Sequence, residues 1–235
     1  MASEPPAAAA TSQGHLMEPS GGPPVRTTVH LLRHGEVHNP EKVLYGRLPG
    51  YYLSDLGHEM AERAAVALAD HDIVSVISSP MERAQQTAAP LAVLHGLEVA
   101  IDANLIEADN VFEGQRVSVG DGVLKQPRAW PRLWNPLRPS WGEPYVDVVA
   151  RMRRAILDAR AQARGHEAVL VSHQLPIWII RLAAEHRPLW HDPRRRQCTL
   201  ASLTSFTFDD DALVMISYAE PAKDLLPGAS KVAGA

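Results

Sequence analysis

The stretch LLRHGE, from Leu31 to Glu36, decides how the rest of the chain is interpreted. It closes an apolar, β-branched run, TTVHLL at residues 27–32, which predicts a buried strand. Two side chains that can carry positive charge follow, and then a glycine, which lets another group approach the backbone. Ligands of open α/β sheets bind beyond the carboxyl ends of the strands. The stretch therefore predicts an anion site at the end of a strand.

Strand-like and helix-like segments alternate along the chain. Helical periodicity predicts helices at 53–71 with Ser54 as N-cap, at 81–96 with Gly96 after its end, at 144–165 and at 175–186. Strands are predicted at 73–79, 97–102 and 168–172, followed by a hairpin of 200–208 and 212–218. Pro90 is expected to kink or interrupt its helix. Apolar strands alternating with helices predict an α/β fold with three layers, α/β/α, and a mostly parallel central sheet.

Composition bounds the class of protein. The 235 residues are 46% apolar and 21% charged, which is typical of one globular domain. A net charge of −4 argues against general binding to nucleic acid or to anionic membranes. Cys198 is the only cysteine, so an internal disulfide is excluded. No apolar run approaches the ~20 residues that span a bilayer, and residues 1–24 lack the pattern of a secretory signal. We expect a cytoplasmic protein.

Breaker-rich and small residues mark both ends of the chain. We expect a disordered tail at 1–24, one domain at 25–220 with an insert at about 108–143, and a flexible tail at 221–235. The insert contains a segment rich in Trp, Pro and Arg at 125–143, which either caps the site or packs on the body. The arginine run at 194–198 is interpreted as a solvated loop.

Three predicted strands end in polar side chains: Arg33 and His34, Ser78 to Pro80 leading into Arg83, and Ser172 with His173. If these ends are neighbours, the two guanidinium groups can grip a phosphate, and amides at the start of the helix after Pro80 add donors. A neutral imidazole with one nitrogen hydrogen-bonded can attack phosphorus with the other. A carboxylic acid near the ester oxygen would protonate the leaving group.

Four motifs occur in the order typical of one family: RHGE at 33–36, SSPMERAQQTA at 78–88, LIEADNVFEG at 105–114 and VLVSHQ at 169–174. Together they span roughly residues 28–218. The chain thus resembles the histidine phosphatase superfamily, the phosphoglycerate mutase-like proteins. The resemblance implies that family's α/β fold and phosphoryl transfer without a metal or cofactor.

The resemblance also implies roles for individual residues. His34 becomes the nucleophile that accepts phosphate, with Arg33, Arg83 and His173 around the phosphate, and His173 is also counted as catalytic. Glu107 falls at the position of the proton donor. From the residues alone, Asp109 and Glu113 stay open as alternative acids.

The chain departs from the family pattern near two motifs. Val37 stands where the family often has Thr, and Asn39 lies five residues past the nucleophile rather than six, although it is still a candidate phosphate ligand. Gln174 replaces a common glycine after the second histidine. Gln174 and Arg47 are candidate substrate contacts.

The function predicted is hydrolysis of small phosphomonoesters through a phosphohistidine on His34. A mutase is the alternative, and it would need extra cations, for which Arg47, Arg116 and the basic residues of 125–138 are candidates. A phosphate-binding module without turnover is a third hypothesis. The expected partner is a small phosphorylated metabolite, with no nucleic acid, membrane, cofactor or metal, and a homo-oligomer is compatible with the sequence.

Overall fold

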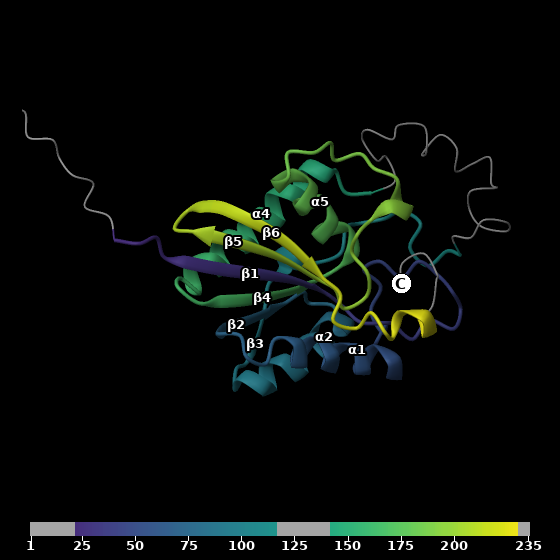
Figure 1. Cartoon of the computed structure of the whole chain (residues 1–235). Coiled ribbons are helices and arrows are strands. Elements are labelled where there is room, and N and C mark those ends of the chain that lie inside the picture. Colours follow the sequence, from purple (N-terminus) through teal and green to yellow (C-terminus); the bar gives the residue numbers. More distant parts are fainter. Residues whose placement is uncertain (1–21, 117–141, 230–235) are drawn as a thin grey trace, which may run out of the picture.

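The structure is a computed structural model and describes residues 22–116 and 142–229. Residues 1–21, 117–141 and 230–235 lie outside the described residues, and with them most of the expected tail at 1–24 and of the Trp-rich segment at 125–143. Figure 1 shows a central sheet with helices on both sides. The α/β class and the three-layer arrangement predicted from the sequence are confirmed.

The elements follow the predicted order along the chain. The strands are β1 (Arg26–Arg33), β2 (Ile73–Ser78), β3 (Val99–Ile101), β4 (Glu167–Ser172), β5 (Leu203–Asp209) and β6 (Ala212–Ala219). The helices are α1 (Asp55–Ala67), α2 (Glu82–His95), α4 (Tyr145–Gln162) and α5 (Gln174–Ala184), with short 3-10 turns η1 (Ala103–Leu105), η4 (Pro193–Arg195) and η5 (Leu226–Gly228).

The sheet has the strand order β3-β2-β4-β1-β5-β6. Neighbouring strands from β3 to β1 are parallel, whereas β5 runs antiparallel to both β1 and β6. The sheet is therefore mixed but mostly parallel. This order makes β2, β4 and β1 neighbours, so that their carboxyl ends meet at one edge of the sheet.

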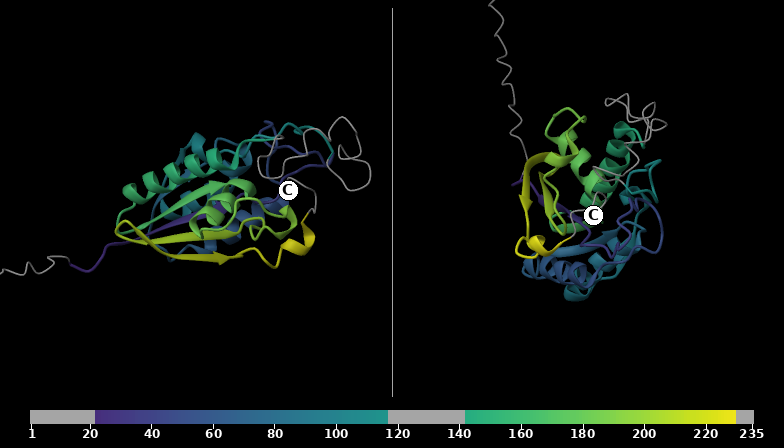
Figure 2. Two further views of the ribbon diagram at one scale, coloured as in Figure 1. Left: turned by 90° about the horizontal axis from the view of Figure 1, so that it is seen from above. Right: turned by 90° about the vertical axis from the view of Figure 1, so that its right-hand side faces the viewer.

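Two apolar clusters fill the spaces on either side of the sheet. Helices α4 and α5 cover one face, where Leu31 of β1 belongs to the same buried apolar cluster as Met152 and Ile179. Helices α1 and α2 cover the other, where Leu32 packs with Met60 and Leu91. The end-on view in Figure 2 shows the sheet between these two layers. Adjacent β1 residues point to opposite faces, as the period of a strand requires.

Local capping signals place the helix ends. The Ser54 hydroxyl accepts a hydrogen bond from the Gly57 amide at the start of α1, as predicted for an N-cap. Gly96 follows α2 in the left-handed conformation, with φ of 66°. Pro90 lies inside α2 without interrupting it, so of the two predicted effects, a kink or a break, the break does not occur. Pro90 removes one backbone donor, and the apolar contacts of Leu91 and Ala88 on either side hold the helix together.

The predicted flexible tail does not begin at Pro221. Ala222 is buried, and Leu225 and Leu226 pack against the cluster under α1 and α2. Apolar side chains spaced along 222–226 give this segment enough contact area to be ordered. In the described ranges, the helices are each too short or too polar to cross a bilayer.

Candidate active site

The carboxyl ends of β1, β2 and β4 meet at one point, as the sequence predicted. The His34 amide donates to the Ser172 carbonyl at 3.1 Å, and the Ser79 amide donates to the Val171 carbonyl at 2.9 Å. These bonds continue the strand pairing just beyond the strand ends. The side chains that follow each strand are thereby brought together.

His34 is a buried imidazole with a defined tautomer. Its Nδ1 lies 2.8 Å from the Gly35 carbonyl oxygen, which can only accept, so Nδ1 carries the hydrogen. The lone pair is then on Nε2. Burial, and after it the charges of Arg83 and Arg33, hold the pKa of His34 well below its usual range. A neutral imidazole with a free lone pair is the form that can attack phosphorus.

His173 packs beside it, with ring centroids 5.1 Å apart. Arg83 Nη2 lies 3.3 Å from His173 Nδ1, and a guanidinium only donates, so this nitrogen accepts. His173 Nε2 then carries the hydrogen and donates to Ser79 Oγ at 2.8 Å. Burial and the charge of Arg83 lower the pKa of His173 well below its usual range. Both imidazoles are therefore neutral.

Arg83, in the first turn of α2, is fully buried. Its Nη2 donates to the Gly46 carbonyl at 2.7 Å. Among the described residues, its Nε and Nη1 have no hydrogen-bond partner, and none of the described carboxylates forms an ion pair with it. Burial lowers the pKa of Arg83 below its ordinary value, as expected for a cation without a counter-ion. A buried guanidinium with two unused donors is suited to an oxyanion.

Two further side chains line the same space. Arg33 is buried and donates through Nη1 to the Cys198 carbonyl at 2.7 Å. Sequence reasoning missed Tyr45, whose ring lies 4.7 Å under the Arg83 guanidinium and 6.4 Å from the His34 ring. Burial raises the pKa of Tyr45 to about 12. Tyr45 thus supports the arginine through a cation–π contact.

Gly35 allows close packing of the backbone against a helix, and it does not open the backbone to a phosphate. A Cβ at this position would lie 2.5 Å from the Gly57 carbonyl oxygen. The group that approaches its backbone is therefore the start of α1. The Gly35 amide donates to Thr87 Oγ1 at 3.1 Å. Beside it, Glu36 accepts from the Ser54 hydroxyl at 2.6 Å, which ties the strand end to the helix cap.

Among the three candidate acids, Glu107 has the properties that best suit a proton donor. Burial raises its pKa above the usual value, even though the Ala108 amide donates to Oε1 and the charges of Arg83, Arg196 and Arg33 act in the opposite direction. The alternative acids differ. Asp109 is exposed, and Glu113 accepts from the Arg47 backbone amide at 2.8 Å.

A clamp of charged side chains, made of Arg47, Glu143 and Arg151, holds the loop that carries Glu107. Arg47 Nε donates to the Glu107 carbonyl at 2.7 Å, and its Nη2 pairs with Glu143 at 2.9 Å. Arg151 pairs with the same carboxylate at 2.8 Å and donates to the carbonyls of Asn104 and Ile106, both at 2.6 Å.

Arg47, predicted as a substrate contact, is therefore occupied by this clamp. Sequence reasoning missed Arg151 and Glu143, because an arginine inside a helix gives no local signal of its partners.

Two other predicted residues lie at the edges of the site. The Asn39 amide accepts from the Val43 backbone and donates to it, at 3.2 and 2.8 Å, so it closes a turn instead of facing the phosphate position. Gln174 begins α5 and donates to the Cys198 carbonyl at 3.2 Å.

Of the arginine run at 194–198, Arg194 and Arg195 are exposed as expected. Arg196 is not part of a solvated loop. It is partly buried, donates to Gln174 at 3.3 Å and to His191 at 2.8 Å, and its charge acts on Glu107.

The site combines two neutral imidazoles, guanidinium donors and a carboxyl group whose pKa is raised. Such a site can hold a tetrahedral oxyanion and exchange a phosphoryl group. A family model of the histidine phosphatase superfamily (branch 1) matches residues 29–221. The chain belongs to this superfamily. The membership confirms the resemblance stated from the motifs, and it makes the chain an enzyme of phosphoryl transfer.

Several relatives are similar to the chain. It is 57% identical over 199 residues to the uncharacterised protein Rv0525 of Mycobacterium tuberculosis, covering 85% of this chain and 98% of the relative. A probable phosphoglycerate mutase, GpmB of Escherichia fergusonii, is 26% identical over 174 residues, covering 72% and 79%. The solved structure of mycobacterial glucosyl-3-phosphoglycerate phosphatase Rv2419c is 25% identical with a TM-score of 0.64, covering 83% and 98%.

Proposed function

We propose that the chain is a metal-independent phosphatase that hydrolyses small phosphomonoesters through a phosphohistidine on His34. One observation carries the proposal: His34 presents an unprotonated Nε2 beside Arg83, whose Nε and Nη1 lack partners among the described residues. Nucleophile and anion donors thus share one buried space. The arginines supply the positive charge that a metal ion supplies in other phosphatases.

The proposed reaction has two steps. His34 Nε2 attacks phosphorus, the bond from phosphorus to the ester oxygen breaks, and Glu107 gives its proton to the leaving alkoxide. Water then attacks the phosphohistidine, Glu107 takes a proton from it, and phosphate leaves with His34 restored. Arg83 binds the phosphoryl oxygens in both steps, and His173, whose Nδ1 accepts from Arg83 Nη2, holds the guanidinium beside His34. The raised pKa of Glu107 supports its role as an acid near neutral pH.

Hydrolysis is favoured over mutase activity by the state of the candidate cations. A mutase must retain a phosphorylated intermediate with a second anionic group, which needs cations with unused donors. The Arg47 guanidinium is paired with Glu143, and Arg116 is exposed and donates to the Glu41 carbonyl at 3.0 Å. The basic residues of 125–138 lie outside the described residues. The name of the GpmB relative makes isomerisation the reaction to assay beside hydrolysis.

The substrate class proposed is a small phosphorylated metabolite. The name of the structural relative Rv2419c suggests sugar-linked phosphoglycerates as the first compounds to assay. Phosphate release and isomerisation should be measured on each ester of a panel of phosphosugars, phosphoglycerates and phosphoserine. Isomerisation faster than phosphate release would replace the phosphatase by a mutase.

The covalent intermediate provides the sharpest test. The chain, treated with chelator, is mixed with a radioactive phosphate ester, and label resistant to base but sensitive to acid is sought on His34. His34→Ala should abolish both label and turnover. His38→Ala changes an exposed histidine on the following loop and should leave both unchanged. Turnover that survives His34→Ala, or that chelator abolishes, would contradict the proposal.

A further inference from the structure

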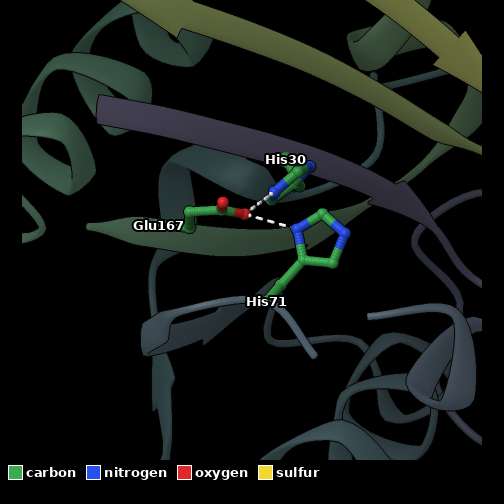
Figure 3. A group of neighbouring side chains, drawn as sticks. All are labelled: His30, His71 and Glu167. Atoms are coloured by element: carbon green, nitrogen blue, oxygen red, sulfur yellow. Dashed lines mark hydrogen bonds and ion pairs between the residues drawn. The ribbon is translucent and has the colours of Figure 1, made fainter. Parts of the chain in front are cut away.

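A second group of chemistry-bearing side chains lies away from the candidate active site. It consists of His30 in β1, Glu167 at the start of β4, and His71 in the connection between α1 and β2. Figure 3 shows the Glu167 carboxylate between the two imidazoles. Glu167 opens β4, whereas His173 follows its last residue. The group, called here the His-Glu-His cluster, is therefore at the opposite end of that strand from the catalytic histidines.

One carboxylate oxygen receives both imidazoles. His30 Nε2 lies 2.6 Å and His71 Nδ1 2.8 Å from the same Oε2 of Glu167. All three ligand atoms lie within 4.8 Å of one another. Tetrahedral zinc, with bonds of about 2.0–2.2 Å, places its ligand atoms roughly 3.4 Å apart. Separations of 2.6 and 2.8 Å therefore need to widen by less than an ångström to admit the ion.

The surroundings of His30 fit a metal ligand. Its other nitrogen, Nδ1, lies 2.7 Å from Ser205 Oγ. A histidine that binds metal through one nitrogen normally donates the hydrogen on the other to an outer partner, which fixes the ring. A serine hydroxyl both donates and accepts. It can therefore donate to Nδ1 while His30 Nε2 donates to Glu167, and accept from Nδ1 once Nε2 binds an ion.

The cluster is also open on one side. The His30 side chain is 6% exposed, that of Glu167 25% and that of His71 41%. An ion can enter from the side of His71, and water can occupy a fourth position. Two imidazoles and one carboxylate form a borderline ligand set that suits zinc better than magnesium or calcium, which prefer oxygen ligands only.

We propose that His30, His71 and Glu167 form a zinc site that joins β1, β4 and the α1–β2 connection. The site is separate from the candidate active site and does not take part in the phosphoryl transfer proposed above. Its ligands lie far apart in the chain, so a zinc ion would crosslink three segments of the folded state. Zinc would bind the folded chain in preference to the unfolded chain and stabilise it.

Metal binding by the full-length chain tests the proposal. Purified protein, stripped with chelator, is titrated with Zn²⁺ by calorimetry, and the same protein is loaded with Co²⁺ and examined for the visible absorption of a tetrahedral site. We expect one bound ion per chain and a higher Tm with zinc. His71→Gln removes a ligand at an exposed position, and should lose the Co²⁺ spectrum and the zinc-dependent rise in Tm.

Two further variants make the result specific. Ser205→Ala should weaken zinc affinity by about 10- to 100-fold, the usual effect of removing an outer partner of a ligating histidine. His58→Gln, at an exposed histidine of α1, is the matched control and should bind like wild type. Zinc binding that is absent in wild type, unchanged in His71→Gln, or lost in His58→Gln would overturn the proposal.

Discussion

Replacing Arg83 should reduce kcat/KM strongly while changing the free energy of unfolding little, and the structure allows both effects to be estimated. Arg83→Met keeps a long apolar side chain over the Tyr45 ring but removes the guanidinium. The two donors without partners among the described residues, Nε and Nη1, are the groups available for a phosphate. A hydrogen bond to a charged group is worth about 1.5–3 kcal/mol, so losing both costs about 3–6 kcal/mol. At about 1.36 kcal/mol for each tenfold, kcat/KM should fall ~10²- to 10⁴-fold.

The stability of the ligand-free protein should change little. Arg83 is a buried cation with no ion pair to a described carboxylate, so removing it relieves a desolvation cost. This gain opposes the loss of its hydrogen bonds to the Gly46 carbonyl and to His173 Nδ1. We expect the free energy of unfolding, measured by urea denaturation, to change by less than about 2 kcal/mol.

Ligand-dependent stability completes the test. Orthovanadate at a hundred times its Kd should stabilise the wild type by about 2.7 kcal/mol. It should not stabilise Arg83→Met. Arg154→Met, at an exposed arginine of α4, is the control and should behave like wild type. A variant that keeps kcat/KM within about threefold of wild type, under 1 kcal/mol by the same conversion, or that retains the response to vanadate, would refute this role of Arg83.

Three other perturbations test separate parts of the site. Because burial raises the pKa of Glu107, the rate of hydrolysis of alkyl phosphates should fall as the pH rises through that pKa. Glu107→Gln should slow the hydrolysis of alkyl phosphates more than that of p-nitrophenyl phosphate, and equal effects would exclude Glu107 as the acid. Arg151→Gln should reduce kcat on alkyl phosphates at least about tenfold because it releases the loop that carries Glu107, and Arg151→Lys should restore part of the rate. Wild-type kinetics in Arg151→Gln would show that the clamp has no part in the mechanism. Gly35→Ala should lower the free energy of unfolding by about 1–3 kcal/mol, because the added Cβ would meet the Gly57 carbonyl. Gly22→Ala, at a position with open space around it, is the control and should leave the free energy of unfolding unchanged. Equal urea midpoints for the two variants would contradict this prediction.

The pH response also follows from the two histidines. Their pKa values lie well below the usual range, so both are neutral throughout the neutral region. Protonation of His34 removes the attacking lone pair only when the pH falls through its lowered pKa. The acid limb of the kcat/KM profile should therefore lie below the ordinary histidine value of about 6.5.

Residue patterns along the chain are enough to place the strand ends and the side chains that follow them. Strand period and helix period are local properties, and Arg33, His34, Arg83 and His173 all sit at the junctions that these periods define. Neighbouring parallel strands bring such junctions together, so the candidate site could be predicted before its geometry was seen. Ser54 and Gly96 were equally predictable, because caps act within one turn of a helix.

The partners that these side chains take depend on how distant segments pack together in the folded chain. The clamp joins Arg47 to Glu143, 96 residues apart, and the His-Glu-His cluster joins His30 to Glu167, 137 residues apart. The role of Gly35 likewise depends on its contact with the start of α1, and that of Arg196 on its hydrogen bond to Gln174. Contacts between segments distant in sequence depend on how whole layers pack. A local pattern of residue types does not predict that packing. The packing in turn determines which polar groups are left without a partner and are available to a ligand.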